Sequence, residues 1–477
     1  MKLASSLNRL GTESAFSVLA EAKKLEAAGN PMIHLGLGQP DFKTPKHVVE
    51  AAKKALDDGH HGYVLSNGIL ECRQAVTRWI KKRYNTEVDA ERITIMPGGK
   101  PTMHYAIQCF GEPGAEIIHP TPAFPIYESM INYTGSTAVP YDLTEDKDLK
   151  FSADKILSLI TDKTRLLILI NPNNPTGSFV EKSEIDKLAE GLKKHPHVTI
   201  LSDEIYSRQI FDGKEMPTFF NYPELRDRLI VLEGWSKAYS MTGWRLGWSF
   251  WPENLIEHVN KLLINSVSCV NAAAQFAGIA ALDGPDDSIH QMMEKFTQRR
   301  KLIHEGLNSL PGIECSLPGG AFYAFPKVIG TGMDGSEFCK RAMHEAGVAI
   351  VPGTAFGKTS KDYVRFSFAA SQDNISNALE NINTPNCLPR NSPSTIPRGT
   401  LSNNEAKDKP SNETPAFAKA NNGIIPKATY GLIACSIFIN KEKSFSFFLW
   451  GIVIANKTPA IVAWIPELCV KSQRKRP

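Results

Sequence analysis

The sequence predicts an α/β fold, with a mostly parallel sheet covered by helices and a smaller α+β region after it. Over about residues 40–282, short apolar runs alternate with helical stretches such as 183–194, which is the pattern of strands joined by helical crossovers. A long helical pattern then covers about residues 288–310. The smaller region opens with Pro-Gly-Gly-Ala-Phe-Tyr and extends over about residues 318–382.

The first informative strand reads Ile-Thr-Ile-Met at residues 93–96, and Pro-Gly-Gly-Lys follows it. A helix is expected to begin near Pro101, because proline is favoured in the first turn of a helix. Glycines allow backbone amides to approach an anion closely, and the helix dipole adds to the attraction. Gly99 and Lys100 are therefore expected in a phosphate cradle.

The next strand is the unbroken apolar run at residues 166–170, which is typical of a strand buried on both faces. It ends in Asn-Pro-Asn-Asn-Pro-Thr-Gly at residues 171–177, which cannot continue a strand or a helix. A plain turn would not require the second asparagine, Asn174.

Two further apolar strands end in ionisable residues. The strand over residues 198–201 precedes Asp203 and Tyr206, and the strand over residues 229–232 precedes Lys237. An arginine, Arg245, follows this lysine after eight residues. A lysine at the end of a buried strand suits a Schiff base to a phosphorylated aldehyde cofactor, with the arginine holding the phosphate.

Together these segments resemble the class I/II aminotransferases, fold-type-I enzymes that use pyridoxal 5'-phosphate. The family patterns are S-K-x-x-x-M-x-G-x-R, which matches residues 236–245, N-P-x-N-P-T-G, which matches residues 171–177, and D-E-x-Y, which matches residues 203–206. The resemblance covers about residues 11–383. It implies that Lys237 holds the cofactor and then acts as the catalytic base and acid.

The resemblance also assigns the cofactor's other contacts. It implies that Asp203 faces the pyridine nitrogen, where a carboxylate keeps a proton in place, and that Tyr206 faces the ring oxygen. Asn174 is expected near this oxygen and near the substrate carboxylate. Ser236 and Arg245 are expected to complete the grip on the phosphate.

Four more positions match sites of the family. Arg365, in an R-x-S-x-A pattern, is expected to bind the substrate α-carboxylate through two hydrogen bonds, with the backbone of Gly38 assisting. Phe124 occupies the position of an aromatic ring that stacks on the pyridine. Tyr63 matches a tyrosine that reaches the phosphate of the neighbouring subunit, which implies a homodimer with shared active sites.

The resemblance implies transamination between an L-amino acid and a 2-oxo acid. Lys100 stands where a subgroup of bacterial aspartate aminotransferases binds the side-chain carboxylate of the substrate, so aspartate and 2-oxoglutarate are the expected pair. Pro101 and Thr102 depart from the Gln-Ala usual in that subgroup. Aminotransferases of aromatic or neutral amino acids and pyridoxal-dependent β-lyases remain alternatives, and a ligand-sensing domain of a transcription regulator is disfavoured.

Composition agrees with an ordinary enzyme. The net charge of +4 over 477 residues is too small and too dispersed to indicate a nucleic-acid partner. Eight cysteines lie far apart without a C-x-x-C pair, which suggests neither a metal site nor redox chemistry and fits the cytoplasm.

Four regions are expected along the chain. Residues 1–39 form an N-terminal arm that packs with the small domain, 40–285 the large cofactor-binding domain, 286–383 the small domain, and 384–477 an atypical tail. The tail begins with a Pro/Ser/Asn/Lys-rich stretch, typical of disorder. Its later apolar run is interrupted by lysines and falls short of the roughly 20 residues of a membrane span. We therefore expect a non-native extension that activity does not need.

Overall fold

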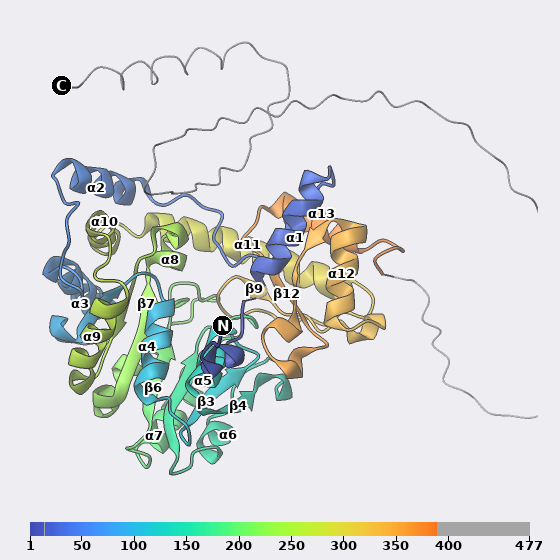
Figure 1. Ribbon diagram of the computed structural model, residues 1–477. Helices are drawn as coiled ribbons and strands as arrows, with labels where there is room; N and C mark the ends of the chain where they lie inside the picture. Colours follow the sequence, from blue (N-terminus) through green and yellow to red (C-terminus); the bar gives the residue numbers. More distant parts are fainter. Residues whose placement is uncertain (14, 389–477) are drawn as a thin grey trace, which may run out of the picture. The chain divides into compact units, whose positions relative to one another are not determined.

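A seven-stranded sheet is the centre of the computed structural model, which describes residues 1–13 and 15–388 (Figure 1). In spatial order its strands are β2 (Ile93–Met96), β8 (Gly247–Phe250), β7 (Leu229–Gly234), β6 (Thr199–Asp203), β5 (Thr164–Ile170), β3 (Glu116–Thr121) and β4 (Thr137–Asp142).

Strand direction brings the ends of these strands together. Strands β4, β3, β5, β6 and β7 pair in parallel, and β8 pairs antiparallel with both β7 and β2. Strand β2 therefore runs in the same direction as β7. The carboxyl ends of β2, β3, β5, β6 and β7 meet at one edge, where ligands bind in open α/β sheets. The prediction of a mostly parallel sheet is confirmed.

Helices cover both faces of the sheet, which explains the unbroken apolar run of β5. Leu167 and Leu169 belong to one buried cluster, whereas Leu166, Ile168 and Ile170 belong to another, because successive side chains of a strand point to opposite faces. The first cluster includes residues of α3 (Leu70–Tyr84), α6 (Ala153–Ser158), α7 (Lys182–Leu192) and α10 (Ala272–Asp283). The second includes residues of α4 (Lys100–Phe110), α5 (Ile126–Thr134) and α9 (Ile256–Ser266).

The smaller part of the fold follows the long helix α11 (Asp287–Ser309). Its three-stranded sheet has the order β11 (Val351–Pro352), β12 (Val364–Ser367), β9 (Tyr323–Ala324), and all its pairs are antiparallel. Two helices, α12 (Gly335–Ala346) and α13 (Gln372–Ile382), accompany this sheet (Figure 1).

The N-terminal segment reaches both parts of the fold. After α1 (Ala15–Ala27), β1 (Ile33–His34) pairs in parallel with β10 (Val348–Ala349). Before α1, the Arg9 side chain donates hydrogen bonds to the carbonyls of Asn132 and Tyr133 at the end of α5. Helix α2 (Lys46–Asp57) then packs against α10, and the short helix α8 (Trp235–Ala238) follows β7.

Residues 1–388 belong to one compact unit, and the boundaries at residues 39, 285 and 383 remain predictions. Cys387 and Leu388 are buried in the main core cluster, so the packed chain continues past residue 383. The predicted tail lies outside the described residues from residue 389 onward. Within the described part, no helix is long and apolar enough to cross a membrane.

Candidate active site

A cavity of about 470 Å³ lies at the carboxyl edge of the main sheet. Its walls come from the segments that follow β2, β3, β5, β6 and β7, from the N-terminal segment, and from β9 and β12. Among its lining residues are Gly38, Gly99, Lys100, Phe124, Asn174, Asp203, Tyr206, Ser236, Lys237, Arg245 and Arg365. The fold therefore brings together every predicted site residue except Tyr63, whose side chain is 92% exposed.

Lys237 is the buried amine of the cavity. It lies on α8, one turn beyond the end of β7, and its Nζ donates a hydrogen bond to the carbonyl oxygen of Gly38 at 2.6 Å. Burial lowers the pKa of Lys237 to about 8, the charge of Arg365 acts in the same direction, and Asp203 opposes it. About a tenth of the amine is therefore neutral at pH 7, far more than for an ordinary lysine, and the neutral form is the one that attacks an aldehyde.

Asp203 is the buried carboxylate at the end of β6. One oxygen accepts a hydrogen bond from the Tyr127 hydroxyl at 2.6 Å, and the other accepts one from the Ile205 amide at 3.2 Å. Burial raises the pKa of Asp203 to about 6, and these two hydrogen bonds limit the rise. The carboxylate is therefore mostly ionised at pH 7 and can hold a cationic ring nitrogen.

Arg365, on β12, is held in place by two acceptors. Its Nη1 donates to Oδ1 of Asn174 at 2.9 Å, and its Nη2 donates to the carbonyl of Gly36 at 2.5 Å. The guanidinium lies within 4.7 Å of the ring centroid of Tyr323 and within 4.6 Å of that of Phe356. Its Nε is buried without a partner among the described residues, and Arg365 also lines the cavity.

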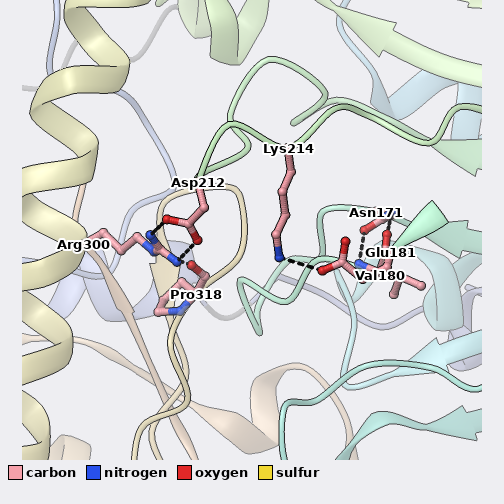
Figure 2. A network of polar contacts seen from close by, with 7 residues as sticks. All are labelled: Asn171, Val180, Glu181, Asp212, Lys214, Arg300 and Pro318. Atoms are coloured by element: carbon pink, nitrogen blue, oxygen red, sulfur yellow. Dashed lines mark hydrogen bonds and ion pairs between the residues drawn. The ribbon is translucent and has the colours of Figure 1, made fainter. Parts of the chain in front are cut away.

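The turn that carries Asn174 is secured at both ends. Within it, the Asn171 side chain exchanges hydrogen bonds with the backbone of Val180 (Figure 2). The carbonyl of Gly177 accepts from the amides of Gly319 and Gly320. A residue with a side chain would not fit at Gly177, because its φ is +67° and an added Cβ would lie 2.2 Å from the carbonyl oxygen of Tyr323.

Arg300 holds the segment at Pro318, which directly precedes the two glycines that contact Gly177. From helix α11 it forms a bidentate pair with Asp212, with both N–O distances at 2.7 Å, and it donates to the carbonyl of Pro318 at 2.5 Å (Figure 2). Lys214, close to Asp212 in sequence, pairs with Glu181 at 2.6 Å. This network ties the loop after β6 to the smaller part of the fold and to the segment that follows the Asn174 turn.

Two glycines and an arginine lie together where the sequence predicts a phosphate cradle. Gly98 has φ +85°, and an added Cβ would lie 2.2 Å from Nη2 of Arg245. Gly99 is the N-cap of α4, which begins at Lys100, one residue before the expected start. Nη1 of Arg245 is held by the carbonyl of Thr242 at 2.7 Å. Backbone amides at a helix start beside a guanidinium form an anion site.

Sequence reasoning missed four residues of the site. Tyr127 binds Asp203, and the hydroxyl of Tyr323 lies 2.8 Å from that of Tyr206. Glu13 and Phe16 line the cavity from the N-terminal segment. No local pattern marks these positions, although Gly38 gives an indirect signal, since an added Cβ there would lie 2.1 Å from the Tyr323 hydroxyl.

Lys100 lies at the cavity wall in an unexpected pairing. Its Nζ is 2.8 Å from a carboxylate oxygen of Glu13. The same ammonium lies 5.4 Å from the ring centroid of Phe124 and 5.8 Å from that of Phe16. The lysine is thus available to the cavity but already has an internal counter-ion.

These groups fit the cofactor expected from the sequence. Lys237 supplies an amine for an aldehyde, Asp203 a carboxylate for a ring nitrogen, and the glycine turn with Arg245 a cradle for a phosphate. Arg365 lines the same cavity and supplies a guanidinium for a substrate carboxylate.

Comparisons with known proteins point in the same direction. A profile of the family "Aminotransferase class I and II" matches residues 30–382. An aspartate aminotransferase of Bacillus subtilis is 34% identical over 388 residues, covering 80% of this chain and 98% of that protein. The crystal structure of the aspartate aminotransferase of Rhizobium meliloti superposes with a TM-score of 0.77 at 32% identity, covering 80% of this chain and 98% of the other. An aromatic aminotransferase of Pyrococcus horikoshii gives a TM-score of 0.71 at 33% identity, with coverages of 76% and 97%.

Proposed function

The chain belongs to the class I and II aminotransferases, and we propose that it transfers an amino group from L-aspartate to 2-oxoglutarate. Enzymes of this family depend on pyridoxal 5'-phosphate, so this chain is a pyridoxal-phosphate-dependent transaminase. When bound, the cofactor withdraws electrons from the substrate's α carbon and carries the amino group between the two half-reactions.

One observation carries the choice of substrate. The cavity contains two cationic side chains, Arg365 and Lys100, besides the amine of Lys237 and the arginine of the cradle. A dicarboxylic amino acid has two carboxylates to place, and an arginine binds one of them with a fixed orientation. Arg365 takes the α-carboxylate with help from Gly38, and Lys100 takes the side-chain carboxylate. The similarity to the aspartate aminotransferase of Bacillus subtilis supports the same choice.

The remaining residues are assigned to the cofactor. Lys237 would hold the cofactor's aldehyde through its amine, and Asp203 would keep the proton on the pyridine nitrogen. Tyr206 and Asn174 contact the ring oxygen. Since Oδ1 of Asn174 is held by Arg365, the amide Nδ2 would be the donor to that oxygen. The backbone at Gly99 and Lys100 would form the phosphate cradle with the side chains of Ser236 and Arg245, and Phe124 would lie against the ring.

Lys237 also moves the proton. When it is free, Nζ of Lys237 would accept the proton from the substrate α carbon and hold it for return. Its pKa of about 8 suits a group that accepts and returns a proton near neutral pH. The contact with the Gly38 carbonyl gives the amine a defined position when it is not bonded to the cofactor.

The test follows the absorption band of the lysine-bound cofactor while single amino acids are added without a 2-oxo acid. Loss of the band with L-aspartate and its return with 2-oxoglutarate are expected. A band that changes with alanine or phenylalanine but not with aspartate would reject the dicarboxylate assignment. Release of pyruvate and ammonia from cystathionine without an acceptor would instead indicate a β-lyase.

An aromatic or neutral amino acid is the second candidate substrate. The Lys100 ammonium lies 5.8 Å from the ring centroid of Phe16 and 5.4 Å from that of Phe124, and Glu13 neutralises its charge. This arrangement offers an apolar surface to an uncharged side chain. The similarity to the Pyrococcus horikoshii aromatic aminotransferase also favours this candidate.

We also propose a homodimer in which Tyr63 reaches the phosphate site of the partner. The exposed hydroxyphenyl group lies between α2 and α3, a region that also exposes Leu56, Leu65 and Leu70. The test mixes a Lys237→Ala protein with a Tyr63→Ala protein under conditions of subunit exchange. Recovery of activity is expected, because one site of the mixed dimer would carry neither substitution. Persistently inactive mixtures of exchanged subunits would reject shared sites.

The cytoplasmic location and the division into an arm, a large domain, a small domain and a tail are part of the same proposal. Limited proteolysis with mass mapping would test the boundaries near residues 39, 285 and 383.

A further inference from the structure

Glu13 separates two adjoining cavities. The inner one is the candidate active site, and the outer one, of about 450 Å³, is lined mainly by the N-terminal segment together with Ile126. Three residues line both cavities, namely Glu13, Phe16 and Lys100. The ion pair of Glu13 with Lys100 therefore forms part of the wall between them.

The carboxylate of Glu13 forms an ion pair with the Lys100 ammonium, as the carboxylate of a ligand would. The two atoms are 2.8 Å apart, and the side chains are 19% and 42% exposed, respectively. The charge of Glu13 also acts on Lys237 in the inner cavity. There, burial and Arg365 lower the pKa of Lys237, and Glu13 acts against them.

We propose that Glu13 is a specificity-determining residue, an internal carboxylate that competes with the distal carboxylate of dicarboxylic ligands for Lys100. With Glu13 in place, a ligand with an uncharged side chain meets a neutral pair rather than an unpaired ammonium. A dicarboxylic ligand must displace Glu13, since two carboxylates at one ammonium repel each other. This inference rests on the proposed role of Lys100 in binding the substrate side chain.

The surroundings allow Glu13 to withdraw. It precedes α1 on a segment held by the bond from the Gly11 amide to Ser129, and the outer cavity gives its side chain space. An ion pair that is partly exposed stabilises only weakly, because water screens it. Displacement therefore reduces the affinity of a dicarboxylic ligand by about fivefold and does not exclude it.

The test measures binding rather than turnover. Succinate and butyrate, which have no amino group to transfer, are titrated into the cofactor-loaded protein by calorimetry. Glu13→Gln is expected to tighten succinate binding by about fivefold and to leave butyrate unchanged. The matched control is Glu21→Gln, which removes an exposed carboxylate of α1 that pairs with His344 away from the cavity. The same Glu13 change in a Lys100→Met background should have no effect on succinate.

Unchanged or weaker succinate binding by Glu13→Gln would overturn the inference, as would equal tightening in the Lys100→Met background. The transamination assay reports separately on the proposed function. If Glu13→Gln binds succinate more tightly while the wild-type protein transaminates only neutral amino acids, the inference stands and aspartate as the substrate fails. If aspartate is transaminated but Glu13→Gln changes nothing, the proposed function stands and the inference fails.

Discussion

Replacing Tyr127 by phenylalanine should weaken the binding of pyridoxal phosphate at low pH and leave it unchanged at high pH. The substitution keeps the ring but removes the 2.6 Å hydrogen bond to Asp203. A hydrogen bond to a charged group contributes roughly 1.5–3 kcal/mol, and 1.36 kcal/mol corresponds to about one pH unit of pKa. The pKa of Asp203, about 6 in the wild-type protein, should therefore rise by about one to two pH units.

Protonation of Asp203 makes cofactor binding weaker as the pH falls. An acid with a higher pKa is protonated over more of the acidic range, and the neutral form cannot hold a cationic ring nitrogen. With a pKa near ~7.5, the ionised fraction at pH 7 falls from about nine-tenths to about a quarter. The dissociation constant for pyridoxal phosphate should then rise about fourfold at pH 7 and more than about tenfold at pH 6. At pH 9 the two proteins should converge, because both carboxyls are ionised.

The assay is a titration of apoprotein with pyridoxal phosphate between pH 6 and 9, followed by absorbance. The test uses the dissociation constant of the mutant divided by that of the wild type at each pH, because the titration of Lys237 affects both proteins alike. Tyr133→Phe on the same helix is the matched control, and it should track the wild type. A ratio for Tyr127→Phe that stays constant from pH 6 to 9 would refute the assigned link between Tyr127 and the charge of Asp203.

Further predictions concern the anchor, the cradle, the supporting network and the tail. Lys237→Ala should abolish turnover in the spectroscopic transamination assay while circular dichroism stays unchanged, because both the covalent anchor and the base are lost. Gly98→Ala should weaken cofactor binding by about tenfold, since a left-handed backbone costs an alanine about 1–2 kcal/mol; wild-type affinity in fluorescence titrations would contradict this. Arg300→Met should lower the free energy of unfolding in urea by about 2 kcal/mol, whereas the exposed control Lys301→Met should lie within about 0.5 kcal/mol of the wild type. Removal of residues 389–477 should leave kcat and KM intact, and an inactive but folded truncation would show that the tail is needed.

Local sequence patterns were sufficient for most of the predicted site. The apolar run before Asn171 predicts a strand buried on both faces, and the structure places its alternate residues in two core clusters. Parallel strands have their carboxyl ends at one edge of the sheet, so residues such as Asp203 and Lys237 could be expected to meet there without coordinates. The start of helix α4 was predicted to within one residue, at Lys100.

Tertiary structure alone decided the partners of those residues. Tyr127 reaches Asp203 across 76 positions of the chain, and Glu13 reaches Lys100 across 87. No spacing in the sequence encodes such contacts, because they depend on how separate helices and loops pack around the sheet. The sequence by itself thus determined the family and the mostly parallel sheet, and it predicted the groups that we propose carry the chemistry. Only the packed chain determined which neighbours set the pKa of Asp203 and which carboxylate occupies Lys100, because both effects act over a few ångströms in space.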